Sequence, residues 1–372
     1  MKLTIERADL LKALSHVQNI VERRNTIPIL ANVLLQAEDG ALKLTATDLD
    51  IEAVDQADAS VGEAGAITAP AQTLFDVVRK LPDGSDVSLS LDPSNQRLSI
   101  EAGRSLFALP TLPASDFQTM SNDEAATEFE IEPDDMRRLI DKTRFAISTE
   151  ETRYYLNGVY LHAAEGDNGP VLRTVATDGH RLALAEIDLP EGAAQLEGVI
   201  VPRKAIAEMR RLIDTTKDPI GISVSDTKVV FRADRAVLTT KLIDGSFPDY
   251  ARVIPKSNEK KLVINSKAFE AAVDRVATIA TERSRAVKMS LDDGRLQLAA
   301  KHAETGQGNE EIEAEYGSEP MEIGFNARYL LDVAAQIEAD DAEFLFHDPA
   351  SPALVLDPDD AAARYVLMPL RV

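Results

Sequence analysis

Residues 2–21 read KLTIERADLLKALSHVQNIV, and this stretch sets the template on which the whole chain is built. Leu3 and Ile5 alternate with polar residues, which predicts a short half-buried strand. The apolar side chains that follow recur at helical spacing, which predicts an amphipathic helix over 8–24. These apolar residues are Leu10, Leu14, Val17 and Val21.

Two later segments repeat this strand–turn–helix template, one starting at Phe129 and Ile131 and the other at Leu262 and Ile264. Each of the three copies also contains a second unit of the same kind, at 67–81, 200–213 and 323–337. A fixed internal repeat of this kind is the first feature to settle, because it decides the fold. The predicted helices cover 8–24, 71–80, 134–146, 203–213, 267–280 and 327–337.

The segments between these helices alternate apolar and polar residues, as half-buried strands do. Turn signals such as Asp39-Gly40 and Asp293-Gly294 separate them. We therefore predict an α+β protein with three repeated domains, each carrying two helices on antiparallel sheets. Polar stretches at 121–124 and 256–259 suggest domain boundaries, and the predicted domains are 1–121, 128–253 and 259–372.

The composition excludes several classes of protein. The 372 residues include no Cys, which rules out disulfide scaffolds, thiol nucleophiles and Cys-ligated metal sites and fits a reducing cytoplasm. No secretory signal and no run of apolar residues long enough for a membrane span is visible. Neither a P-loop nor a dinucleotide fingerprint is present. We expect no cofactor, no metal and no membrane partner.

The net charge of −23 argues, taken alone, against a nucleic-acid partner. The charge is unevenly distributed, however, because the six predicted helices sum to +6 and the rest of the chain to −29. Equivalent helices on a repeated chain should share one surface, and a mildly positive surface suits loose contact with phosphates. Lys and Arg on the solvated faces of ordinary helices would give the same count.

Three short segments could carry chemistry. Asp178-Gly179-His180-Arg181 resembles an acid–base pair, although neighbouring residues rarely face one another and no serine nucleophile elbow is present. His302 and His347 lie near carboxylates but lack the spacing of metal ligands. Arg153-Tyr154-Tyr155 could stack on bases or sugars, or one Tyr could belong to the core.

The C-terminal segment 365–372, YVLMPLRV, is apolar almost to its end. Chain ends usually fray unless they are docked. A Met- and Leu-rich end therefore predicts either a docked strand or part of an adaptable apolar groove for a partner.

At these residues the chain closely resembles the bacterial beta sliding clamps, the processivity subunits of replicative DNA polymerases. The resemblance runs in one register over essentially the whole sequence and is strongest in seven stretches. They are MKLTIER (1–7), TIPILAN (26–32), RYYLNG (153–158), TVATDGHRL (174–182), VPRK (201–204), FPDY (247–250) and MPLR (368–371).

The resemblance implies a head-to-tail homodimer that closes into a ring of six similar domains around duplex DNA, lined by helices. It implies no catalysis, and a cytoplasmic, nucleoid-associated location. Such a ring tethers the replicative DNA polymerase, and the clamp loader and the repair and translesion polymerases bind it through short linear peptides. Tethering raises the effective concentration of the polymerase at the primer end.

The resemblance also implies three sets of site residues. The partner-peptide groove would use Leu156, Thr177, Gly179, His180, Arg181, Leu182, Pro248, Arg252, Val253, Val366, Met368, Pro369, Leu370 and Arg371. Contact with DNA would use Arg24, Tyr154, Tyr155, Arg203 and Lys204. The dimer interface would use Val77, Leu81, Phe107, Leu109, Thr278, Ile279 and an acidic partner, Glu304, with Glu310 and Glu311 as further candidates.

Three positions depart from the pattern of well-studied clamps. Pro352 replaces a groove serine, Glu150 replaces a glutamine on a DNA-facing loop, and Gln72 replaces a basic residue. Two alternatives remain open at this point. One is a hydrolase-like enzyme that uses Asp178 and His180, and the other is an acidic scaffold that does not touch DNA.

Overall fold

The structure is a computed structural model that describes residues 1–22, 26–92, 94, 96–121, 124–280 and 286–371. The chain forms two compact units. The first unit comprises Met1–Arg137, Pro190–Leu196 and Lys204–Leu242. The second unit comprises Arg138–Leu189, Glu197–Arg203 and Ile243–Val372.

The first unit contains two antiparallel sheets. A five-stranded sheet has the order β5-β1-β7-β8-β9, and an eight-stranded sheet has the order β10-β15-β16-β17-β4-β3-β2-β6. The strands are β1 (Lys2–Glu6), β2 (Asn32–Glu38), β3 (Ala41–Thr47), β4 (Ile51–Asp58), β5 (Ser60–Glu63), β6 (Gly65–Pro70), β7 (Asp86–Asp92), β8 (Arg97–Ala102), β9 (Ser105–Pro110), β10 (Thr127–Ile131), β15 (Ile220–Val224), β16 (Lys228–Ala233) and β17 (Ala236–Lys241).

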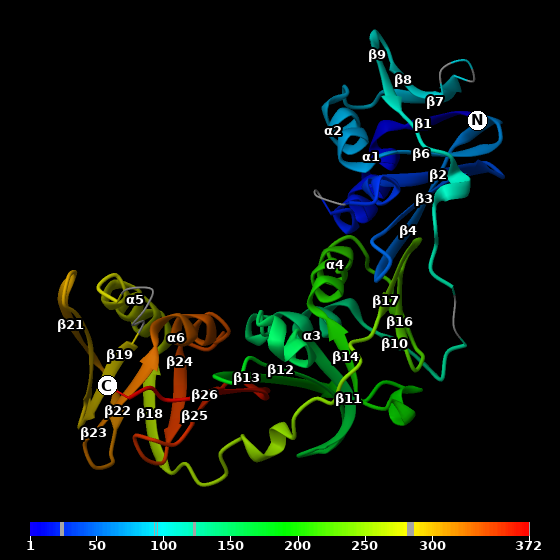
Figure 1. Cartoon of the computed structure of the whole chain (residues 1–372). Coiled ribbons are helices and arrows are strands. Elements are labelled where there is room, and N and C mark those ends of the chain that lie inside the picture. Colours follow the sequence, from blue (N-terminus) through cyan, green and yellow to red (C-terminus); the bar gives the residue numbers. More distant parts are fainter. Residues whose placement is uncertain (23–25, 93, 95, 122–123, 281–285, 372) are drawn as a thin grey trace. The chain divides into compact units, whose positions relative to one another are not determined.

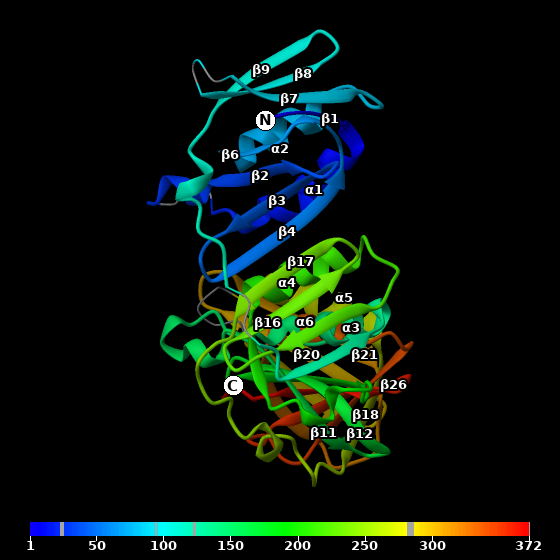
Figure 2. The same cartoon turned by 90° about the vertical axis from the view of Figure 1, so that its right-hand side faces the viewer.

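The eight-stranded sheet joins the first repeat to the middle repeat. β4 of the first repeat pairs antiparallel with β17 of the middle repeat, in the register Val54 to Val237 and Ala53 to Leu238. Figure 2 shows the strands running from β2 through β4 to β17 and β16 as one sheet. The tight turn between β2 and β3 is made by Asp39-Gly40, where both residues have positive φ, as a two-residue hairpin of matching twist requires.

Two helices of the first unit, α1 (Arg7–Val17) and α2 (Ala71–Lys80), lie side by side (Figure 1). They bury the apolar positions that the sequence pattern picks out, Leu10 and Leu14 on α1 and Leu74 and Val78 on α2. Each of these side chains is fully buried, which removes its apolar surface from water and stabilises the fold by about 1.5–3 kcal/mol.

The second unit also contains two antiparallel sheets, of nine strands (β14-β11-β12-β13-β26-β25-β24-β18-β22) and four strands (β21-β20-β19-β23). The strands are β11 (Gly158–Gly166), β12 (Gly169–Thr177), β13 (Arg181–Asp188), β14 (Val199–Pro202), β18 (Lys260–Asn265), β19 (Ala286–Asp292), β20 (Arg295–His302), β21 (Gly306–Glu313), β22 (Glu315–Tyr316), β23 (Met321–Asn326), β24 (Asp341–Phe346), β25 (Ala353–Asp357) and β26 (Asp360–Leu367).

The nine-stranded sheet joins the middle repeat to the third repeat. β13 pairs antiparallel with β26, with Arg181 opposite Leu367 and Leu182 opposite Val366. The apolar C-terminal segment is therefore a docked strand as far as Leu367, and its backbone N–H groups are satisfied by a neighbouring strand. This junction positions the candidate site described below.

The helices follow the sequence prediction closely in position but end earlier in several cases. They are α3 (Pro133–Asp141), α4 (Arg203–Ile213), α5 (Ser266–Ala277) and α6 (Ala327–Ala334). The helix predicted over 134–146 stops at Asp141 because Thr143 leaves helical geometry and begins a short 3₁₀ turn. Asn326 caps α6, its side chain accepting a hydrogen bond of 3.0 Å from the backbone N–H of Arg328.

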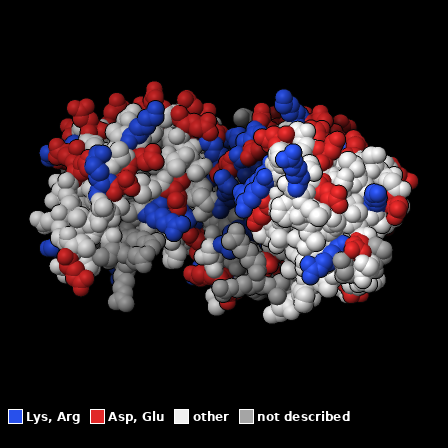
Figure 3. All heavy atoms as spheres, turned by 90° about the horizontal axis from the view of Figure 1, so that it is seen from above, with Lys and Arg blue, Asp and Glu red and all other residues white. Residues whose placement is uncertain are grey.

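The α+β class and the three repeated domains are therefore confirmed, whereas the domain boundaries stay a prediction. None of the helices in the described part of the chain is long and apolar enough to cross a membrane. Acidic side chains are spread over the face seen in Figure 3, and Lys and Arg lie in smaller groups among them. Within its observed bounds α4 carries a net charge of +3, whereas α3 carries −1.

Candidate functional site

A largely apolar hollow of about 380 Å³ opens beside the junction of β13 and β26 in the second unit. Residues from four parts of the second unit converge on it: the segment before β11, the β12–β13 region, the chain on either side of Tyr250, and the end of β26 with the residue after it. Its lining consists of Arg153, Tyr155, Leu156, Thr177, Gly179, Arg181, Leu182, Pro248, Tyr250, Val253, Val366 and Met368. We call this hollow the groove.

The floor of the groove belongs to a hydrophobic cluster that is continuous across the β13–β26 junction. Leu182 and Val366 face each other across the strand pair and are almost fully buried. Tyr250, Val175 and Leu184 extend the cluster beneath them. A rigid apolar floor with a few polar groups at the rim suits an apolar side chain from a ligand.

Arg181 fixes one wall of the groove and is only 7% exposed. Its guanidinium donates to the Asp332 carboxylate, to the Phe145 carbonyl oxygen at 2.6 Å and to the Asp178 carboxylate at 3.1 Å. It also lies over the Tyr329 ring, 4.4 Å from the centroid. Because its donors are taken up within the protein, Arg181 shapes the wall instead of offering a free charge to a ligand.

Tyr250 is held at the groove floor by a polar network beneath it. Its hydroxyl lies 2.9 Å from His162 Nε2 and accepts a hydrogen bond from Arg173 at 3.0 Å. Burial lowers the pKa of His162, so the neutral imidazole is favoured. A buried Tyr with its polar end satisfied presents a stable apolar face on the other side.

The structure brings nine of the fourteen predicted groove residues together, and five lie outside the lining. Arg252 is highly exposed and pairs with Asp249, and His180 stacks against Tyr329. Pro369, Leu370 and Arg371 follow Met368 along the C-terminal tail and leave the groove. The N–H of Leu370 donates to the carbonyl of Gly324 on β23, which directs the tail away.

Three lining residues were missed as groove residues by the sequence. Tyr155 was predicted to contact DNA. Arg153 and Tyr250 belong to stretches that resemble the sliding clamps, but neither was predicted to line the groove. All three reach the hollow from loops or short 3₁₀ turns, at Glu151–Leu156 and Tyr250–Arg252. Such segments lack the periodicity that would have indicated which side chains point inward.

The geometry removes the acid–base pair suggested by Asp178 and His180. Asp178 accepts hydrogen bonds from the backbone N–H of His180 at 2.9 Å and of Arg181 at 3.0 Å. Its second oxygen is taken by the Arg181 side chain. The carboxylate therefore shapes a turn, with Gly179 at a φ of 85°, and does not orient the His180 ring.

The predicted DNA contacts fall in different settings. Arg24 lies outside the described residues. Tyr154 is 55% exposed, and Arg203 is exposed at the start of α4. Lys204 differs from these two residues, because its ammonium is engaged within the protein. It donates to the Ile20 carbonyl at 2.9 Å and pairs with Asp48.

Several of the predicted dimer residues lie on or beside strands at the edges of two sheets. β9 is an edge strand of the five-stranded sheet and exposes Phe107 to 41%. β21 is an edge strand of the four-stranded sheet. Leu81 and Leu109 are mostly buried in their own domain, and Val77 on α2 is partly exposed. Thr278 and Glu304 are exposed and Ile279 is partly exposed, and the Ile279 carbonyl accepts a hydrogen bond of 2.6 Å from Thr305, just before β21. Glu310 pairs with Arg275 of its own repeat, and Glu311 lies 3.7 Å from Arg295.

The three departures from the clamp pattern have local partners. The Pro352 carbonyl accepts a hydrogen bond of 2.9 Å from Asn258, and Pro352 does not line the groove. Glu150 pairs with Arg153 at 3.0 Å, and Gln72 donates to Asp76.

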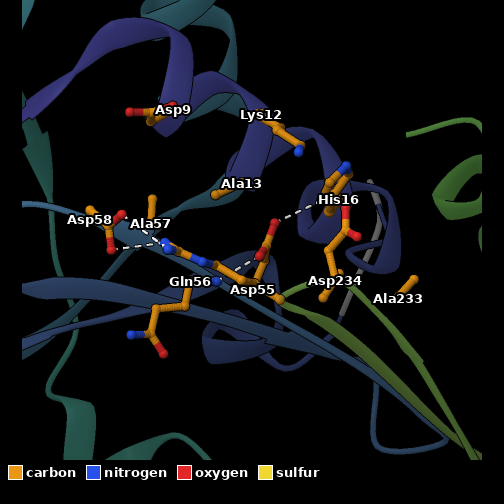
Figure 4. Close-up of a pocket in the computed structure, with 12 residues that line it drawn as sticks. Asp9, Lys12, Ala13, His16, Asp55, Gln56, Ala57, Asp58, Ala233 and Asp234 are labelled. Atoms are coloured by element: carbon orange, nitrogen blue, oxygen red, sulfur yellow. Dashed lines mark hydrogen bonds and ion pairs between the residues drawn. The ribbon is translucent and has the colours of Figure 1, made fainter. Parts of the chain in front are cut away.

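A second hollow, of about 360 Å³, lies in the first unit between α1, β4 and the turn from β16 to β17 (Figure 4). His16 Nδ1 lies 2.7 Å from Asp55 Oδ2, and Arg235 pairs with Asp58 at 2.8 and 3.0 Å. The Arg235 guanidinium lowers the pKa of Asp58 through its hydrogen bond and charge. The Arg235–Asp58 pair fastens the middle repeat to the first repeat, whereas the His16–Asp55 pair joins α1 to β4 within the first repeat. Among the described residues no cluster of His, Asp or Glu is arranged to hold a metal ion.

Family models match three successive segments of the chain. They are the N-terminal domain of the DNA polymerase III beta subunit at residues 1–121, the central domain at 130–249 and the C-terminal domain at 251–371. The beta sliding clamp of Caulobacter vibrioides is 58% identical over 372 residues, and that of Escherichia coli K12 is 37% identical over 373 residues. Both alignments cover 100% of each chain.

Solved structures agree with this result. A Caulobacter crescentus beta sliding clamp with PEG bound is 58% identical with a TM-score of 0.97, and covers 100% of this chain and 99% of its own. A Bartonella birtlesii sliding clamp bound to griselimycin is 46% identical with a TM-score of 0.97, over 100% of both chains. The chain therefore belongs to the beta sliding clamps, the DNA polymerase III beta subunits, which form dimeric rings and serve that polymerase as non-catalytic processivity subunits.

Proposed function

We propose that two copies of this chain close head to tail around duplex DNA and slide along it without reading its sequence. The groove carries the proposal, because it is a preformed apolar hollow where a tethered protein can attach. We propose that linear peptides of the replicative polymerase, the clamp loader and the repair and translesion polymerases occupy it in turn. An apolar anchor buried there contributes about 1.5–3 kcal/mol, which suits reversible exchange.

The edge strands support the way in which the ring closes. A head-to-tail contact brings two different surfaces together, and it closes after two copies if the rotation between them is twofold. β9 of one copy and β21 of the other are sheet edges with unpaired backbone groups, as such a contact needs. We propose that Phe107 on β9 meets Ile279 and Thr278 beside β21.

Closure also explains why an acidic protein can hold DNA. Phosphate contacts supply most non-specific affinity, and a chain of net charge −23 offers few of them. A closed ring needs little affinity, because the DNA cannot leave sideways. We propose Tyr154, Tyr155 and Arg203 as loose contacts, with Lys204 assigned mainly to its pairing with Asp48. We place this activity in the cytoplasm, at the nucleoid.

Retention on circular and linear DNA tests this topological link. The protein is loaded by its clamp loader onto a nicked circular duplex, and the protein–DNA complex is then isolated by gel filtration. We expect the protein to stay with the circle and to be lost once a restriction enzyme linearises it. Equal retention on both forms, or on neither, would contradict encirclement and favour either direct DNA binding or an acidic scaffold.

A further inference from the structure

Besides the groove, the second unit contains another hollow, which lies on the four-stranded sheet, on the face opposite α5. It encloses about 420 Å³. Side chains alternate along each strand, so Val287 and Met289 of β19 are buried while Lys288 points to the other face. The lining consists of Ala286, Lys288, Ala299, Ala300, Lys301, Gln307, Asn309 and Arg371, and we call it the basic hollow.

The basic hollow is positively charged on a strongly acidic protein. Lys288 pairs with Glu322 at 2.8 Å, but Lys301 and Arg371 are exposed and no described carboxylate pairs with either. The lining contains no Asp or Glu among the described residues. Gln307 and Asn309 add amide donors at the rim, and the small alanine side chains leave room above the sheet. This combination fits a carboxylate better than a cation or an apolar group.

The C-terminal tail connects the basic hollow to the groove. Met368 lines the groove, and Arg371 lines the basic hollow. Between them the N–H of Leu370 donates to the Gly324 carbonyl at 2.8 Å, which fixes the tail beside β23. Three residues of extended chain span at most about 10 Å. A peptide that leaves the groove in extended form beside this tail therefore reaches the basic hollow within three or four residues.

We propose that the basic hollow binds an Asp or Glu carboxylate of a partner segment that flanks a groove-bound peptide. The partner would combine apolar anchors with an acidic residue three or four positions beyond them. This inference rests on the proposed role of the groove and adds a charge preference to it. Exposed pairs of this kind are weak, so the acidic residue adjusts affinity while the apolar anchors supply most of it.

Peptide titrations with the full-length dimer test the proposal. Three fluorescent peptides share one Leu/Phe anchor sequence and carry a neutral extension, an acidic N-terminal extension or an acidic C-terminal extension. Each is titrated against the unchanged protein, Lys301→Gln, and the control Lys267→Gln. Lys267 is an exposed lysine on α5 and does not line the basic hollow, so the control loses the same charge elsewhere in the same repeat.

We expect one acidic peptide to bind the unchanged protein about two- to fivefold more tightly than the neutral peptide. The advantage should vanish in Lys301→Gln, persist in Lys267→Gln and fade at about 0.5 M salt, where exposed charges are screened. If neither acidic peptide gains affinity, or the gain survives Lys301→Gln, the basic hollow is not a subsite although the groove stands. If the neutral peptide fails to bind the unchanged protein, the groove assignment falls as well.

Discussion

Two side chains of the C-terminal tail, two positions apart, differ in whether they line the groove. Met368 and Leu370 are 37% and 39% exposed, and the sequence resemblance assigns both to the groove. Only Met368 lines it. The N–H of Met368 donates to the His180 carbonyl and that of Leu370 to the Gly324 carbonyl, so the two residues are anchored to different sheets.

Truncation of each side chain in turn should therefore have unequal effects. We expect Met368→Ala to weaken a Leu/Phe anchor peptide about tenfold, because one apolar wall of the groove is lost. Leu370→Ala should change the affinity by less than about twofold. Fluorescence anisotropy with the neutral peptide measures both values. Equal losses of affinity in the two variants would mean that the peptide also contacts Leu370 and that the binding surface extends beyond the residues that line the groove.

At the scale of elements, the connection from β9 to β10 is tied down at defined points. The N–H of Met120 donates to Glu52 Oε2 at 2.8 Å, and Lys228 donates to the Ser121 carbonyl at 2.7 Å. Glu52 is buried on β4, and this burial raises its pKa above the usual value of 4.5. The hydrogen bond from Met120 thus holds the Glu52 carboxylate in a buried position where its negative charge is disfavoured.

The raised pKa predicts how Glu52→Gln responds to pH. A raised folded-state pKa contributes stability below the unfolded pKa, and this contribution is lost as pH rises through the folded value. At pH 7 the carboxylate is therefore unfavourable, whereas glutamine keeps an acceptor for the Met120 N–H. We expect Glu52→Gln to raise the midpoint of thermal unfolding by roughly 1–2 °C at pH 7 and to have no such effect near pH 4.

Scanning calorimetry of the variants at the two pH values measures this difference. Glu52→Ala is the matched control, because it removes the charge and the acceptor together and leaves the Met120 N–H unpaired. It should lower the midpoint at both pH values. A lower midpoint for Glu52→Gln at pH 7 would show that the charged hydrogen bond outweighs the burial of the carboxylate.

At the scale of the whole molecule, we propose that assembly uses strands left at the edges of sheets. β9 exposes Leu106 and Phe107 to 68% and 41%, and a hydrophobic edge of this kind invites pairing with another chain. The family forms dimeric rings, and this edge is the surface that we propose for closure. A charge placed there should block assembly without disturbing the interior of the first unit.

Phe107→Asp should therefore convert the dimer to a monomer at micromolar concentration. Sedimentation velocity measures the change, and circular dichroism should remain that of a folded protein. Ile27→Asp is the matched control, since Ile27 is 46% exposed in the same repeat but away from β9, and it should leave the dimer intact. A dimer that survives Phe107→Asp would place the interface elsewhere.

Much of the fold could be predicted from local patterns, and the pairings between repeats could not. The alternation in Leu3 and Ile5 and the helical spacing of Leu10 and Leu14 depend only on neighbours along the chain. The joining of β4 to β17 and of β13 to β26 depends on which edges meet after the repeats fold. Helix ends were also missed where a turn interrupts the pattern, as at Thr143.

The sequence by itself determined the three repeats, the strand and helix positions and the family, because these follow from local periodicity and from residue identity. Nine of the fourteen residues that the resemblance assigns to a partner groove line one hollow, and the use of this hollow by a partner stays a prediction. Only the tertiary structure decided that Tyr250 belongs to the groove, that Leu370 leaves it, and that Lys301 and Arg371 meet over one sheet. The physical reason is that a side chain's surroundings are set by strands distant in sequence, and no local pattern records which of them will pair.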